Sequence, residues 1–290
     1  MVTAYGHAKI NLTLDILGKR PDGFHEVAMV MQELSLHDTV TMEKTEKGIS
    51  LEIEADGIYG GEALSADETN LAWRAAALLQ EEYGLAGVSM RLCKQIPIAA
   101  GLAGGSADAA AVLCGMNELY GLGLDEEELC RYGAKLGSDI PFCIRGGTMF
   151  ATGRGEVLTP LPALPEIPVV LAKPHVAVST PWAYKTYDEK GSSEHPDNEA
   201  IRKEIMRKDW KAVSKLLCNV LERVTIERYE EISKYKQLMR EHGAFASMMS
   251  GSGPTVFALA ETEKEASALA DKMREMTDAE VIQTSTAVKR

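Results

Sequence analysis

The sequence has few cysteines, few aromatic residues and no long apolar run. Its five cysteines are odd in number and widely separated, which excludes a disulfide framework and the Cys-x-x-Cys spacing of a structural metal site. No apolar run approaches the roughly 18 residues that a membrane span needs, and the first residues lack the charged and apolar regions of a signal peptide. We therefore expect free thiols, a cytoplasmic protein and no membrane partner.

Basic residues are scarce relative to acidic ones. The chain has 31 Lys and Arg against 43 Asp and Glu, a formal net charge of −12. Because such a charge repels phosphate backbones unless one cleft is locally basic, we expect no nucleic-acid partner. The hydrophobic content of 45 % and the charged content of 26 % favour a folded core over extended disorder. The length of 290 residues predicts one large domain or two ordinary ones.

Strand patterns dominate the beginning of the chain. Apolar and polar residues alternate over 9–16, which predicts a half-buried strand with Lys9 and Asn11 on its polar face. The proline and glycines of 18–23 predict a tight connection to a second, antiparallel strand. A further strand-like stretch covers 40–54.

Helix signals follow in the next part of the sequence. Helical spacing of apolar residues predicts a helix over 71–83. The alanine-rich segment 107–120 predicts another helix, with Ser106 as its N-cap. Asp125 and Glu128 have the spacing of a capping box at the start of a third.

A cluster of prolines over 160–168 predicts a boundary near Leu161, which gives two lobes of 1–160 and 161–290. The second lobe has both strand and helix patterns. It is expected to contain strands over 169–172, 244–249 and 255–260, and helices over 199–221, 227–242 and 263–276.

Two glycine-rich loops are candidate anion sites. In the loop over 97–106, backbone amides and the new helix could bind a phosphate, or the glycines could simply form a tight strand-to-helix turn. The loop lacks the Gly-Lys-Ser/Thr ending of a P-loop, and two glycines of the dinucleotide fingerprint fall on Ala103 and Ser106. The segment 250–254 is a second anion-binding candidate or a plain hairpin.

Lys9 and Asp139 each allow two interpretations. Lys9 could belong to an ordinary solvated strand face, and Asp139 could be only a helix cap after Gly137. An Asp at a helix start stays ionised, and beside a lysine it could hold and help to deprotonate a hydroxyl.

Five segments together resemble the GHMP kinase superfamily, and they run in the right order across essentially the whole chain. The segments are AKINL (8–12), RPDGFHE (20–26), PIAAGLAGGSADAAA (97–111), GSDIPF (137–142) and MSGSGPTVF (249–257). The resemblance implies a two-lobed α+β fold. Its N-terminal lobe would be like domain 2 of ribosomal protein S5 and its C-terminal lobe ferredoxin-like, with a cleft between them.

The first two segments resemble the members that act on a cytidine diphosphate-linked alcohol. This implies phosphorylation of the C2 hydroxyl of a diphosphocytidyl methylerythritol in the non-mevalonate route to isoprenoid precursors, with ATP and Mg²⁺ as cofactors. The implied partner is this small molecule, and the protein is expected to be a monomer or homodimer. The alternatives are a GHMP kinase for another small alcohol and a nucleotide-binding regulator without catalysis.

The resemblance also implies roles for individual residues. Lys9 and Asp139 match the catalytic pair, with Asp139 as base and Lys9 polarising the hydroxyl, and Ser106 is a candidate Mg²⁺ ligand. The implied ATP-binding residues are Pro97, Ile98, Ala99, Ala100, Gly101, Leu102, Ala103, Gly104, Gly105, Ser106, Ala107, Ser250, Gly251, Ser252 and Gly253. The implied substrate-binding residues are Asn11, Phe24, His25, Met31, Thr180 and Tyr184, of which Phe24 and Tyr184 would sandwich the cytosine and His25 would read its polar edge.

Three positions depart from the pattern of the superfamily's cytidine-recognising members. Phe24 stands where a Tyr is common, Met31 where an aromatic residue is common, and Ala107 where a second Ser is usual. Phe24 keeps the stacking face, and the loss of a serine hydroxyl at Ala107 leaves the backbone donors of the loop intact.

Overall fold

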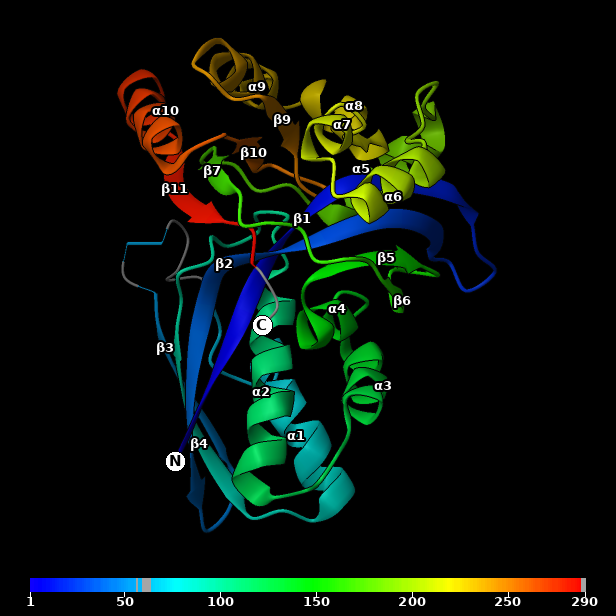
Figure 1. Cartoon of the computed structure of the whole chain (residues 1–290). Coiled ribbons are helices and arrows are strands. Elements are labelled where there is room, and N and C mark those ends of the chain that lie inside the picture. Colours follow the sequence, from blue (N-terminus) through cyan, green and yellow to red (C-terminus); the bar gives the residue numbers. More distant parts are fainter. Residues whose placement is uncertain (56, 59–63, 288–290) are drawn as a thin grey trace. The chain divides into compact units, whose positions relative to one another are not determined.

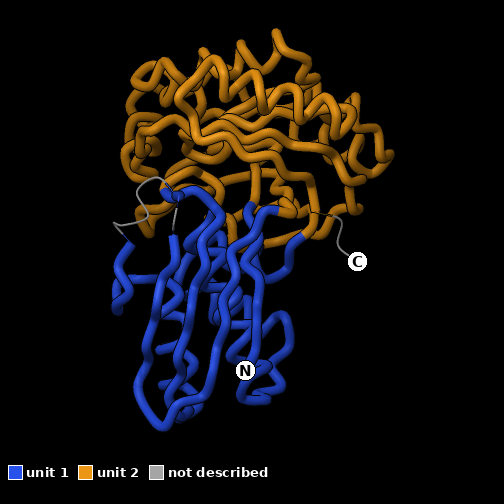
Figure 2. Tube along the Cα trace, turned by 90° about the vertical axis from the view of Figure 1, so that its left-hand side faces the viewer, with its two compact units in different colours: residues 1–8, 36–98, 103–146 blue, residues 9–35, 99–102, 147–290 orange. Residues whose placement is uncertain are grey.

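The computed structural model describes residues 1–55, 57–58 and 64–287. These divide into two compact units whose segments alternate along the sequence (Figure 2). Unit 1 comprises residues 1–8, 36–98 and 103–146, and unit 2 comprises residues 9–35, 99–102 and 147–290. The first two strands, β1 (Val2–Lys19) and β2 (His25–Thr45), therefore contribute residues to both units.

Unit 1 packs helices against one face of a small sheet (Figure 1). Its further elements are β3 (Ile49–Glu54), α1 (Leu71–Tyr83), β4 (Gly87–Cys93), α2 (Gly104–Tyr120), α3 (Glu126–Leu136) and α4 (Ile140–Arg145). Strand β4 lies between β2, to which it is antiparallel, and β3, to which it is parallel, with Met90 opposite both Met42 and Leu51. The alanines of α1 and α2 pack on the buried residues of β2 and β4, so that short side chains bring helix and sheet close together.

Unit 2 contains a four-stranded antiparallel sheet of order β11-β7-β10-β9, with α9 and α10 packed against it (Figure 1). Its strands, besides the segments from β1 and β2, are β5 (Thr148–Thr152), β6 (Val157–Pro160), β7 (Pro168–Lys173), β8 (Cys218–Asn219), β9 (Ala246–Met249), β10 (Val256–Leu259) and β11 (Glu280–Ser285). Its helices are α5 (Thr180–Lys190), α6 (Asn198–Arg207), α7 (Trp210–Ser214), α8 (Val220–Ile226), α9 (Glu230–Glu241) and α10 (Glu263–Met276).

Several elements expected from the sequence are present with the expected bounds. The helices over 71–83 and 263–276 are α1 and α10. The capping box of Asp125 and Glu128 is formed in both directions at the start of α3. Strands β7, β9 and β10 match their expected segments to within two residues at either end. Among the described residues, no helix combines the length and apolar character needed to cross a membrane.

Other expectations about the elements are wrong. Ser106 does not cap α2, because the helix begins at Gly104 and its N-cap is Ala103 in the left-handed conformation, with φ 60°. The strand-like stretch 40–54 is interrupted at 46–48, between β2 and β3. The N-cap of α5 is Ser179, whose hydroxyl accepts the capping hydrogen bond from the amide of Trp182.

The expectation of one long helix over 199–221 is also wrong. Lys208 takes a left-handed φ of 59° and ends α6, and Asp209 then caps the short α7. Cys218 and Asn219 form β8, which pairs parallel with β1. The apolar spacing across 199–221 is helical, but the sequence pattern does not reveal the pairing of β8 with a strand some 200 residues away.

Candidate active site

The polar face of β1 in unit 2 carries a buried lysine. Lys9 Nζ donates to Asn11 Oδ1 at 2.7 Å and to the carbonyl of Gly101 at 3.2 Å. Lys9 is only 4 % exposed and Asn11 is fully buried, so the interpretation as a solvated strand face is excluded. Because burying an ammonium is costly unless oxygens surround it, these contacts hold its charge at a fixed place.

The second glycine-rich loop lies against this lysine within unit 2. Ser250 Oγ donates to the carbonyl of Gly101 at 3.0 Å. A Cβ atom on Gly251 would lie 3.0 Å from that carbonyl oxygen and 3.3 Å from Lys9 Nζ, and Gly251 has a φ of +58°. Only glycine fits both the conformation and the space here. The loop is therefore more than a plain hairpin, because it places backbone groups beside a buried ammonium.

Residues 99–102 of the first glycine-rich loop belong to unit 2 and contact the second loop. A Cβ atom on Gly101 would lie 2.3 Å from the carbonyl oxygen of Ser250. The amide of Lys9 donates to the carbonyl of Leu102, and the amide of Thr255 donates to that of Ala100. Two segments about 150 residues apart thus pack backbone to backbone around Lys9.

Residues 103–107 of the same loop belong to unit 1, where they form the start of α2. A buried charge cluster lies next to this start: Lys94 Nζ pairs with Asp38 and donates to Asp108 Oδ2 at 2.7 Å. Asp38 Oδ1 also accepts from the backbone amides of Gln95 and Ile96, at 2.5 and 2.8 Å. The cluster therefore fixes the segment that enters the loop.

Burial raises the pKa of the Asp108 carboxyl to about 8, against the opposing effect of the Lys94 ammonium. Sequence reasoning missed Lys94 and Asp38 as parts of this region. No local signal could have found Asp38, which reaches Lys94 only through the pairing of β2 with β4.

Asp139 stands directly before α4 in unit 1 and is half-buried. It occupies the N-cap position, but its side chain makes no capping hydrogen bond. Pro141 follows at the start of the helix. The interpretation of Asp139 as only a helix cap is thus not supported by its side chain.

The residues expected to bind the cytidine lie in unit 2. The rings of His25 and Tyr184 are 4.9 Å apart with an angle of 38° between their planes. His25 Nε2 lies 2.7 Å from Asp188 Oδ1, and Lys19 Nζ donates to the other oxygen of Asp188 at 3.0 Å. The hydrogen bond from His25 is the main reason that the pKa of Asp188 is lowered.

Phe24, Thr180 and Met31 differ in their surroundings. Phe24 is half exposed after its Pro-Asp-Gly turn, and the Arg154 guanidinium lies over its ring at 5.0 Å. Thr180 Oγ1 lies 2.9 Å from Ser252 Oγ, which links α5 to the second loop. Met31 is fully buried in β2 opposite Met149.

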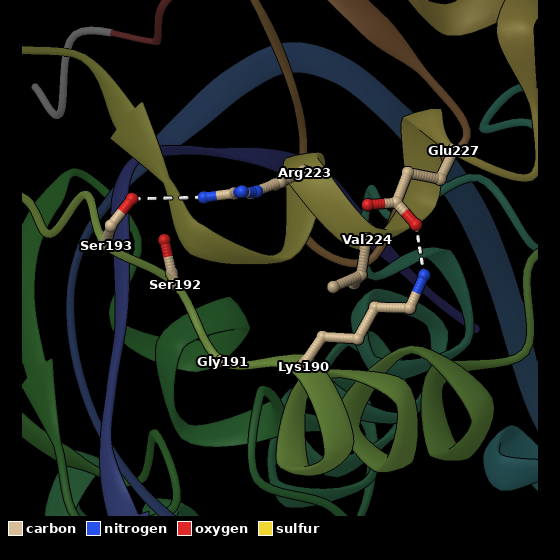
Figure 3. A pocket seen from close by; sticks show the side chains of 7 residues that line it. All are labelled: Lys190, Gly191, Ser192, Ser193, Arg223, Val224 and Glu227. Atoms are coloured by element: carbon tan, nitrogen blue, oxygen red, sulfur yellow. Dashed lines mark hydrogen bonds and ion pairs between the residues drawn. The ribbon is translucent and has the colours of Figure 1, made fainter.

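A separate pocket of about 630 Å³ lies in unit 2 and contains none of the expected site residues (Figure 3). It is lined by Lys190, Gly191, Ser192, Ser193, Arg223, Val224 and Glu227. Lys190 pairs with Glu227, and Arg223 donates to Ser193 Oγ at 3.0 Å. Because its charged groups already have partners within the chain, we do not assign this pocket to the active site.

The described residues contain no cluster of three or more His, Cys, Asp or Glu side chains that could hold a metal ion. Mg²⁺ in phosphoryl-transfer sites is usually held by few protein groups together with substrate phosphates and waters. The Ser106 hydroxyl in the first turn of α2 fits such a partial coordination.

Comparison with known proteins places this geometry in a family. The GHMP kinases N terminal domain matches residues 70–147, and the GHMP kinases C terminal domain matches residues 201–279. A 4-diphosphocytidyl-2-C-methyl-D-erythritol kinase of Acetivibrio thermocellus is 47 % identical over 91 % of this chain and 92 % of its own. One of Geobacillus kaustophilus is 45 % identical over 93 % and 92 %.

Solved structures similar to this chain include a kinase of the same name. A crystal structure of 4-(cytidine 5'-diphospho)-2C-methyl-D-erythritol kinase covers 99 % of this chain and 100 % of its own, with a TM-score of 0.80 and 34 % identity. A homoserine kinase from Cytophaga hutchinsonii covers 99 % and 95 % with a TM-score of 0.75, but its identity of 17 % shows a common fold alone. This chain belongs to the GHMP kinases, within the family of the 4-diphosphocytidyl-2-C-methyl-D-erythritol kinases, and has their α+β fold.

Proposed function

We propose that this protein transfers the γ-phosphoryl group of ATP to the C2 hydroxyl of 4-diphosphocytidyl-2-C-methyl-D-erythritol, a step of isoprenoid precursor synthesis. One observation carries the proposal: in a chain of this kinase family, the ammonium of Lys9 is buried beside the backbone of two glycine-rich loops. A fixed positive charge next to closely packed backbone is suited to a reaction in which negative charge moves between phosphate oxygens.

Lys9 and Asp139 form the proposed catalytic pair. Asp139 accepts the proton of the C2 hydroxyl while Lys9 polarises that hydroxyl and stabilises the carboxylate. The oxygen of the hydroxyl forms a bond to the γ-phosphorus, the bond from that phosphorus to the β,γ-bridging oxygen breaks, and ADP leaves. Since the transition state of phosphoryl transfer is loose, positioning and charge stabilisation contribute more than the strength of the base.

The two glycine-rich loops form the proposed triphosphate site. The backbone amides of residues 97–107 and 250–253 bind the phosphate oxygens, as the start of a helix and a glycine-rich turn commonly do. Ser106 would hold Mg²⁺ as one of its ligands, and the ion would neutralise charge on the β- and γ-phosphates. Ala107 has no hydroxyl and contributes to the phosphate site through its backbone amide alone.

The cytidine end of the substrate is proposed to bind in unit 2. Phe24 and Tyr184 stack on the cytosine, and His25 reads its polar edge, which the contacts of His25 with Tyr184 and Asp188 support. Asn11 and Thr180 place the rest of the substrate. Met31, which is fully buried in β2, supports the substrate site from within the core.

We further propose that the protein is cytoplasmic, works on small molecules without a nucleic-acid or membrane partner, and is a monomer or homodimer.

A coupled assay that follows ADP release tests the function. With ATP and Mg²⁺, we expect turnover of 4-diphosphocytidyl-2-C-methyl-D-erythritol and little or none of homoserine or mevalonate. Faster turnover of another alcohol would show that the proposed substrate is wrong. No turnover of any alcohol, with ATP still bound in calorimetry, would favour a regulator instead.

A further inference from the structure

The second glycine-rich loop is held in place by one side chain that the proposed mechanism does not use. Asn219 Nδ2 donates to the carbonyl oxygens of Met249 and Gly251, at 2.9 and 2.8 Å. Its Oδ1 accepts from the amide of Leu221 at 3.0 Å, which caps α8. The buried side-chain amide of Asn219 thus donates both of its N–H groups to carbonyls of one short segment, 249–251. These two hydrogen bonds hold the segment in addition to its own backbone hydrogen bonds.

Two further side chains of α8 contact the same segment. Glu222 is buried, lies close to the backbone of Met249 and pairs with Lys236. The Thr225 hydroxyl lies 2.9 Å from the carbonyl of Leu221 and 3.4 Å from that of Ser252. Glu222 and Thr225 are three positions apart, so they lie on one face of α8, and Asn219 directly precedes this helix as its N-cap. This face contacts the backbone of 249–252.

Asn219 also connects the loop to the strand that carries Lys9. It is the last residue of β8, and in the parallel pairing of β8 with β1 it stands opposite Leu14. The loop in turn packs on Lys9 and Gly101 through Gly251. A displacement of the loop relative to β1 therefore changes the surroundings of the Lys9 ammonium.

We propose that Asn219 is a positioning residue for phosphoryl transfer: through its two hydrogen bonds to Met249 and Gly251 it fixes the loop 250–253 at the distance from Lys9 that ATP binding requires. Glu222 and Thr225 support the loop from the same helix face. This inference rests on the proposed role of the loop in binding the triphosphate.

The Asn219→Asp variant tests the proposal with almost no change of shape. The carboxylate keeps the acceptor for the Leu221 amide but turns an oxygen toward two carbonyl oxygens, which repel it. We expect the KM for ATP to rise and kcat to fall, each by about tenfold. The KM for the cytidine substrate should change less, because the proposed cytosine contacts lie outside the loop and only Thr180 reaches it, through Ser252. Asn219→Ala, which removes the donors without adding charge, should show the same pattern in weaker form.

Hydrogen exchange separates positioning from a loss of stability. Amides of 249–253 should exchange faster in both variants, while those of β7 and β10 remain protected. The matched control is Tyr235→Phe, which removes a different hydrogen bond of unit 2, from the Tyr235 hydroxyl to Asp278 at 2.9 Å, and should leave both KM values unchanged.

Wild-type KM for ATP in both Asn219 variants would overturn the inference, and so would faster exchange across all of unit 2. Failure of the proposed function looks different: the wild-type protein then lacks turnover of the cytidine substrate, while the exchange measurement still reports on the hydrogen bonds of Asn219.

Discussion

At the scale of single residues, the two candidate catalytic groups are held in contrasting ways. Lys9 is buried and held by Asn11 and a carbonyl oxygen, so its position is fixed by β1 and the first glycine-rich loop. Asp139 is half-buried at the start of a short helix and does not use its side chain as a cap.

Asp139→Asn should therefore lower kcat strongly and leave nucleotide binding intact. The amide has nearly the shape of the carboxylate but cannot accept the proton, and positioned bases contribute about 10²- to 10⁴-fold to rates. The coupled assay measures kcat, and calorimetry with ADP measures binding. Turnover within a few-fold of wild type would remove Asp139 from the mechanism.

Asp188→Asn should weaken binding of the cytidine substrate. Asp188 lies on α5, one helical turn after Tyr184, and forms a hydrogen bond with His25. It also forms an ion pair with Lys19. With an amide at this position His25 loses its charged partner, so its ring is less well oriented toward the base. We expect the KM for the cytidine substrate to rise and the KM for ATP to stay constant. As a control, Asp271→Asn changes an exposed acidic residue of α10 and should alter neither.

At the scale of elements, the start of α2 depends on a buried ion cluster rather than on a capping side chain. The N-cap is an alanine in a left-handed conformation, whereas Asp108 in the helix pairs with Lys94, which also pairs with Asp38. The sequence predicts the helix from its alanines, but Asp38 belongs to a strand about 65 residues before the loop.

Lys94→Met should destabilise the fold, because it leaves Asp38 buried without its counter-charge and Asp108 without its hydrogen-bond donor. Breaking a buried ion pair from one side typically costs about 3 to 5 kcal/mol in the free energy of unfolding. Denaturation by urea measures this change. The matched control is Lys272→Met, which removes an exposed ion pair with Glu275 and should have little effect. Equal effects of the two variants would show that the cluster is not important for stability.

At the scale of the whole molecule, the compact units do not coincide with continuous halves of the sequence. Unit 2 takes in residues 9–35 and 99–102 as well as everything from 147 onward. Within it, β8 pairs with β1, β5 pairs with β2, and His195 contacts Asp15 at 2.6 Å. These contacts cross long stretches of sequence inside one unit.

A fragment of residues 161–290 should accordingly be much less stable than the full chain. It keeps the sheet of β7, β9, β10 and β11 but loses the strand that pairs with β8 and the carboxylate that binds His195. We expect helical circular dichroism with a broad thermal transition at a lower temperature. A sharp transition at the temperature of the full chain would show that residue 161 separates two independently folding lobes.

Local patterns and motifs were sufficient to predict the family, the elements with strong periodicity or capping signals, and the candidate catalytic residues. The helix over 263–276 and the capping box at Asp125 depend on contacts within a few residues, so periodicity and capping rules were sufficient to predict them. The glycines of both loops could be read in the same way, as positions where the backbone needs unusual conformations.

The surroundings of those residues depend on contacts between distant parts of the chain. The burial of Lys9, the ion cluster of Lys94 and the hydrogen bonds of Asn219 join residues that are 92, 56 and about 30 positions apart. The short strand β8, hidden within a helical pattern, belongs to the same class. Such contacts depend on strand pairing and on hydrogen bonds between side chains and backbone carbonyls of distant segments. The local spacing of residue types does not predict these interactions.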